Sequence, residues 1–155
     1  MNRFSRLEEL RRIKEDAAGQ AFARTLMRVE DLRQRITELD RQTEEEKRAA
    51  IEALAAPGPN RPDPGLLESF LAGQIWRRQR LEMALRRARE DSEAARENWR
   101  LTRMQLQQAE NLAEKEDGRQ RVEARRNEMK EMDFVAISRV GRDSNGQFQA
   151  RRGVA

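Results

Sequence analysis

One stretch near the middle of the chain, APGPNRPDPG at residues 56–65, contains all four prolines of the 155-residue sequence. Proline lacks a backbone N–H and its ring clashes with the preceding turn, so a cluster of this kind ends a helix. Because no proline occurs on either side, each flanking region is free to form one long helix. We therefore expect two helical segments joined by a bend at residues 55–64.

The composition excludes several classes of protein. Charged residues make up 39% of the chain and aromatic residues 5%, which is unsuited to a compact globule with a broad apolar core. The sequence has no Cys and no His, which excludes disulfides, thiolate or imidazole metal ligands and a histidine base. No uncharged run approaches the length of a membrane span. We expect a soluble, cytoplasmic protein that is not an enzyme, has no cofactor and does not insert into a membrane.

The region before the bend has the heptad pattern of a coiled coil. One row of the seam contains Phe22, Val29, Ile36, Thr43 and Ala50, and the other contains Thr25, Leu32, Leu39, Glu46 and Ala53. Leu10, Ile13 and Ala17 fall in a different frame. This mismatch predicts a four-residue shift of the frame before Phe22. We expect one helix over residues 3–54.

The region after the bend begins with a helix-start signal. Asp63 is suited to cap the helix and Pro64 to occupy its first position. Alternating steps of four and three residues then define a seam that is mostly apolar. Its positions are Leu67, Leu71, Gln74, Arg78, Leu81, Leu85, Ala88, Ser92, Ala95, Trp99, Thr102, Leu106, Ala109 and Ala113.

These two patterns predict an all-α fold, a long antiparallel two-helix coiled-coil hairpin over residues 1–140. The second helix is expected over residues 65–138 and is longer than the first, so its C-terminal part lacks a full partner helix. Residues 141–155 contain turn-forming residues and no periodicity, which predicts a disordered tail. Because the bend lets each seam be covered within one chain, we expect a monomer, with the unpartnered part of the second helix as the place where copies could associate.

Apolar residues near the bend suggest a partner-binding surface. Leu66, Phe70, Ile75 and Trp76 lie off the seam row through Leu67 and Leu71. Exposed apolar patches that contain aromatic residues are typical of protein interfaces. The alternative is that the loop of the bend folds over these side chains as a local cap.

The basic run RRQRLEMALRRAR, at residues 77–89, raises the possibility of nucleic-acid binding. The seam continues through Leu81, Leu85 and Ala88 within this run, which places the arginines mainly on the solvent face of a helix that is already paired. Acidic and basic residues also alternate along the whole chain, unlike the long basic region of a basic leucine zipper. We therefore favour a solvated surface and expect no nucleic-acid partner.

The C-terminal stretch KEDGRQRVEARRNEMKEMDFVAISR, at residues 115–139, carries a family resemblance. Arg126 and Glu128 form an arginine-x-glutamate step, and Asp133 is the first acid of a pair whose second place is taken by Phe134. Together with the predicted hairpin, this stretch resembles the FliJ/YscO family, the central stalk proteins of flagellar and virulence type III secretion ATPases. The resemblance covers residues 3–139.

The resemblance implies a non-enzymatic stalk at the secretion apparatus, which couples the hexameric type III export ATPase to the membrane export gate protein. The end that carries both termini would enter the ATPase ring, and the bend would face the gate. The charged residues expected at the ring are Arg121, Arg125, Arg126, Glu128 and Asp133. Two other functions remain open, a coiled-coil scaffold or export chaperone that binds partner helices and, less favoured, a nucleic-acid-binding coiled coil.

Overall fold

The computed structural model describes residues 3–152, with side chains for residues 4–143. Two helices account for almost all of this range, α1 (Arg3–Ala55) and α2 (Pro64–Arg152), and the described residues contain no strand. The chain divides into two units. We call Arg11–Leu106 the paired unit and Met1–Leu10 with Gln107–Ala155 the terminal unit, and describe each by itself.

The bend lies where the proline cluster predicts it. Asp63 caps α2, because the backbone N–H of Gly65 donates to its Oδ1 at 3.0 Å, and Pro64 occupies the first helical position. Gly58 adopts a φ of 147°, a value that side chains disfavour. Proline, a capping aspartate and a glycine in a restricted conformation thus reverse the chain between Ala55 and Pro64.

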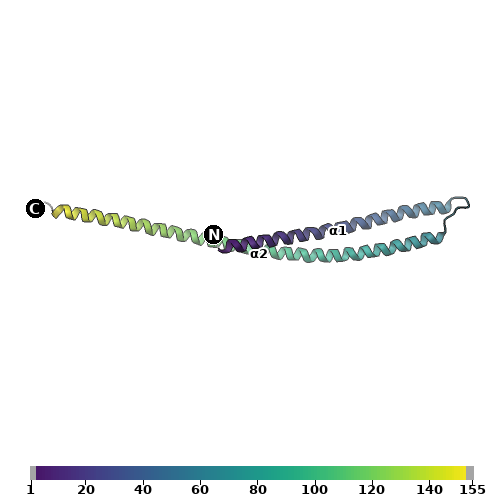
Figure 1. Cartoon of the computed structure of the whole chain (residues 1–155), viewed down its shortest axis with the longest axis horizontal. Coiled ribbons are helices and arrows are strands. Elements are labelled where there is room, and N and C mark those ends of the chain that lie inside the picture. The colour runs from purple at the N-terminus through teal and green to yellow at the C-terminus, as the bar shows by residue number, and fades with distance from the viewer. Residues whose placement is uncertain (1–2, 153–155) are drawn as a thin grey trace. The chain divides into compact units, whose positions relative to one another are not determined.

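The paired unit is an antiparallel two-helix coiled coil, in which α1 and α2 lie side by side (Figure 1). Its core contains Val29 and Leu32 from α1 and Ala88 from α2. Leu81, Ala84 and Leu85 pack against them. The predicted all-α hairpin with a longer second helix is confirmed.

The α2 seam follows the predicted frame. Every predicted position from Leu67 to Leu106 in the paired unit is buried or half-buried, as are Ala109 and Ala113 in the terminal unit. The polar seam residue Arg78 is matched by Asp40 of α1, to whose Oδ1 its Nε donates at 2.8 Å. A polar seam position is therefore tolerated where the facing helix supplies its partner.

The predicted frame shift in α1 is wrong. Ala18 is buried and Glu15 and Arg11 are half-buried, so the frame of Phe22 continues toward the N-terminus in unbroken heptads. Ile13, by contrast, is 59% exposed. Polar contacts to α2 explain the outcome, because Arg11 Nη1 donates to Gln105 Oε1 at 2.5 Å and Glu15 accepts a hydrogen bond from Trp99.

The seam near Trp99 contains a close aromatic contact. Its Nε1–H donates to Glu15 Oε1 at 2.8 Å, and its ring stacks on that of Phe22 with the centroids 5.7 Å apart. A Cβ placed on Gly19 would lie 3.2 Å from Trp99 Nε1. Glycine at this position therefore lets the indole sit against the backbone of α1.

Two further boundaries differ from the prediction. Glu46 and Ala53 are exposed, and Leu54 takes the last seam position of α1 instead. At the other end α2 runs to Arg152, so the predicted helix end at residue 138 and the disordered tail are wrong for residues 141–152, while residues 153–155 lie outside the described residues. Each glycine in this stretch disfavours a helix by only about 1 kcal/mol relative to alanine, and no proline interrupts it.

Candidate protein-interaction surfaces

Two of the residues predicted to bind a partner near the bend form an outward surface of the paired unit. Ile75 and Trp76 are 60% and 57% exposed. Met83, which the sequence pattern did not single out, is also exposed and lies seven residues after Trp76 on the side of α2 opposite the seam. The Arg80 guanidinium covers part of the indole, 4.8 Å from its ring centroid. We call Ile75, Trp76, Arg80 and Met83 the outer patch.

Phe70 and Leu66 do not belong to the outer patch but to a groove near the bend. Phe70 is half-buried, because it directly precedes the seam residue Leu71 and flanks the seam. It lines a groove of about 190 Å³ together with Leu54 of α1 and Pro62 of the bend, and Leu66 lies at the rim of the same groove while remaining 66% exposed. The sequence left open the alternative that the loop of the bend caps these side chains. This alternative applies in part to Phe70 and Leu66, and it does not apply to the outer patch.

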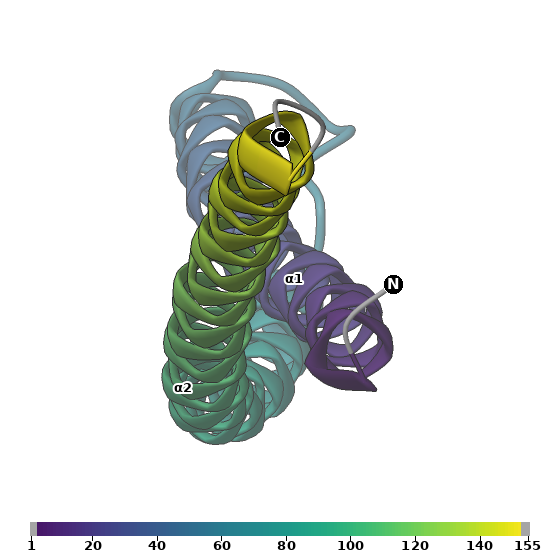
Figure 2. The same cartoon turned by 90° about the vertical axis from the view of Figure 1, so that its left-hand side faces the viewer.

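In the terminal unit, the later part of α2 has no covering helix. Ala109 and Ala113 are buried, whereas every residue from 117 to 143 is exposed. Figure 2 looks along this part of α2, whose green-to-yellow turns form one continuous helix. We call residues 117–143 the uncovered segment. All five charged residues predicted to meet an ATPase ring lie within it.

The uncovered segment does not bring those five residues together. Arg126 lines a shallow basic groove that also contains Arg119 and Lys130, arranged around Val122. Arg121 lies in a separate depression lined by acidic residues, Glu8, Glu110, Glu114 and Asp117. The predicted basic group of Arg121, Arg125 and Arg126 is therefore divided between faces. Helical spacing would have placed Arg119 and Lys130 beside Arg126, at seven and four residues from it.

A third face of the uncovered segment contains apolar residues. Met132, Val135 and Ala136 line a depression together with the charged residues Glu128, Glu131 and Arg139. Met132 is 65% exposed. Glu128 therefore lies beside apolar side chains, apart from the basic groove that contains Arg126.

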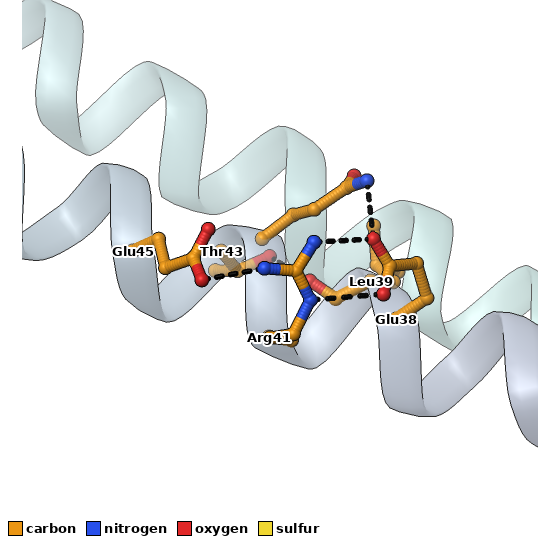
Figure 3. Close-up of polar contacts among 6 residues, drawn as sticks. Glu38, Leu39, Arg41, Thr43 and Glu45 are labelled. Carbon is orange, nitrogen blue, oxygen red and sulfur yellow. Dashed lines mark hydrogen bonds and ion pairs between the residues drawn. The ribbon is translucent and has the colours of Figure 1, made fainter.

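The clearest charge network lies on the solvent side of the paired unit (Figure 3). Arg41 donates through Nε and Nη2 to the two oxygens of Glu38, at 2.9 and 2.6 Å, and through Nη1 to Glu45. The hydrogen bonds from Arg41 and then Gln42 lower the pKa of Glu38 from 4.5 to about 2. Acids in this network are matched by neighbours on their own helix, which makes it a surface network and not a binding site.

The described residues contain no group of three or more acidic side chains placed to hold a metal ion. None of the described helices combines the length and apolar character needed to cross a membrane. Comparison of the chain with models of known families, with curated proteins and with solved structures gives no match.

Proposed function

We propose that this chain is a non-enzymatic central stalk of a type III secretion system, which couples the hexameric export ATPase to the membrane export gate. The observation that carries the proposal is the uncovered segment. A helix that is exposed throughout residues 117–143, and that carries charges of both signs, presents a long surface to another protein. The ring would be the partner that covers it.

The basic groove is the part of the uncovered segment that we assign to the ring. Arg119, Arg126 and Lys130 project from neighbouring turns around Val122. Exposed ion pairs are individually weak, so several must act together to give measurable binding. An acidic surface on the ring would meet all three at once, whereas Arg121 already lies among acidic residues of its own unit.

The outer patch is the surface that we assign to the export gate. Ile75, Trp76 and Met83 are exposed, and Trp76 and Met83 lie on the side of α2 opposite the seam. Aromatic residues in such patches are frequent anchors of protein interfaces. Their removal should affect a partner more than the fold, because they contribute little to the seam.

The ring contact is tested by measuring binding of the full chain to the export ATPase from the same genome, and stimulation of its ATP hydrolysis. A variant with Arg119→Glu, Arg126→Glu and Lys130→Glu should lose most of both activities at low salt, since reversed charges repel an acidic ring. A control with Arg121→Glu and Arg125→Glu should retain them. Equal loss in both variants, or no loss in the first, would contradict the assignment of the basic groove.

The gate contact is tested separately with Ile75→Ala combined with Trp76→Ala. Helicity and unfolding should be nearly unchanged, while capture of the gate protein should fall by about tenfold or more, as expected for interface anchors. Phe70→Ala is the matched control, because Phe70 lies in the groove with Leu54 and should affect stability rather than gate binding. Undiminished gate binding by the double variant would exclude the outer patch.

A coiled-coil scaffold or export chaperone is the second candidate. Leu101 and Met104 are 47% and 48% exposed on the outer side of α2 in the paired unit. Such a stripe could receive a partner helix along the hairpin. Binding of secretion chaperones that is abolished by Leu101→Glu, without any binding to the ATPase, would favour this function over the stalk.

A further inference from the structure

The uncovered segment carries an apolar stripe in a frame of its own. The seam of the paired unit, continued past Ala113 and Glu116, would reach the polar residues Gln120, Glu123, Asn127 and Lys130. That frame becomes apolar again only at Phe134 and Ile137. A second row, through Val122, Met129, Met132 and Ala136 at steps of seven, three and four residues, is apolar at each of these positions. Val122 and Met129 are 53% and 61% exposed. A seam thus exists that no part of α1 covers.

The charges that flank this stripe distinguish between possible pairings with an identical helix. In the heptad frame of the stripe, Arg126 and Asp133 occupy one flank, and Arg121 and Glu128 occupy the other. A parallel pair would place Arg121 against Arg126 and Glu128 against Asp133, both of which are like-charge contacts. An antiparallel pair would place Arg126 against Asp133 twice, once in each direction. The charge pattern therefore disfavours parallel pairing and favours antiparallel pairing.

We propose that residues 122–139 of α2 bind the same segment of a second copy of the chain as an antiparallel helix pair. Met129 then packs against Met132 of the second copy, and the reverse contact forms by symmetry. Ala136 lies opposite the Arg125 side chain, and Val122 lies opposite Arg139. The methylene groups of Arg125 and Arg139 cover the ends of the seam while their guanidinium groups stay in water.

This inference goes beyond the proposed stalk function and does not depend on it. The pairing uses residues of one segment only and requires no ATPase. Arg126 takes part in both proposals, so a paired segment cannot offer its basic groove to a ring at the same time. Self-association would thereby hold the chain in a form that is unable to bind the ring until the two copies separate.

The test is the mass of the full-length chain by sedimentation equilibrium, from about 1 μM to about 500 μM, with charge-reversal variants. The unaltered chain should pass from monomer to dimer within this range. Arg126→Asp alone and Asp133→Arg alone should each raise the dimer dissociation constant about tenfold, because two attractive contacts become repulsive. The variant that carries both changes should regain the original dissociation constant.

A second measurement tests the orientation independently of the charges. The chain has no cysteine, so Met129→Cys and Met132→Cys introduce single thiols. On oxidation of a mixture, the disulfide that joins a Met129→Cys chain to a Met132→Cys chain should form faster than a disulfide that joins two copies of the same variant. A monomer at all concentrations, a failure of the double charge reversal to restore pairing, or preferential linkage of two Met129→Cys chains to one another would each overturn the proposal.

Discussion

Two stretches of the same helix, residues 67–113 and residues 117–143 of α2, differ in whether they have a seam that is buried against a partner helix. Both are helical, highly charged and free of proline. In the first stretch the seam positions stay in one heptad frame and are buried or half-buried throughout. In the second the same frame passes through polar residues from Gln120 to Lys130, and every side chain is exposed. Favourable local propensity is enough to make a stretch helical, whereas the pairing of two helices requires an apolar row that stays in register.

Polar seam residues sharpen this comparison. Arg78 occupies the seam of the first stretch, yet α1 offers Asp40 as its partner across the hairpin. In the second stretch the same frame passes through Gln120, Glu123, Asn127 and Lys130 in succession. One polar layer can be matched by the facing helix, but four consecutive ones leave no apolar surface to bury.

The largest expected effect comes from the core of the paired unit. Leu32 is 5% exposed and packs with Val29 and Ala88. Leu32→Ala should destabilise the chain by about 2–3 kcal/mol, because it removes buried methyl groups and leaves a cavity. The matched change in the uncovered segment, Ile137→Ala, should cost less than about 0.5 kcal/mol. Urea unfolding followed by circular dichroism measures both, and equal effects would abolish the distinction between the two stretches.

A smaller effect, of opposite sign, is expected at Gln74. This side chain is 7% exposed, and its Oε1 accepts no hydrogen bond from the described residues. Gln74→Leu should raise the free energy of unfolding by about 1–2 kcal/mol, since an unsatisfied polar atom is replaced by apolar volume. Urea unfolding provides the value. A loss of stability would show that Gln74 has a partner in solution or that the seam requires it for register.

The smallest effect concerns the pKa of Glu38. Arg41 and Gln42 lower this pKa from 4.5 to about 2, so ionised Glu38 stabilises the folded chain above about pH 4.5, and the contribution is lost as the pH falls toward 2. Exposure keeps the contribution small. Stability differences between the unaltered chain and Glu38→Gln should therefore shrink between pH 6 and pH 3. A difference that grows on acidification would contradict the sign.

Most of the fold could be predicted because local signals and the heptad frame agree. The proline cluster, the Asp63 cap and the regular seam of α2 each depend on residues close together in sequence. The N-terminal frame could not be predicted by apolar spacing, because Arg11 and Glu15 are held at the seam by Gln105 and Trp99, far away in sequence. The apolar Ile13 misled the prediction by lying on the outer side.

The candidate sites were predictable only in part. Ile75 and Trp76 could be recognised as off-seam apolar residues, but Phe70 was grouped with them although it is half-buried and lines the groove near Leu54. The division of Arg121 from Arg126 follows from the helical faces and from acidic neighbours such as Glu8, which α1 supplies. Contacts of this kind depend on the pairing of the helices and have no signal in a short stretch of sequence.

Hydrogen exchange of the full chain, at low concentration with and without the export ATPase hexamer, tests the central claim most directly. In the free chain, amides of residues 67–113 should exchange about a hundredfold more slowly than those of residues 117–143, because isolated helices are only marginally stable in water. Addition of the ATPase should slow exchange in residues 117–143 and leave residues 67–113 nearly unchanged. Equal protection of both stretches in the free chain, or no change at residues 117–143 on addition of the ATPase, would contradict the account.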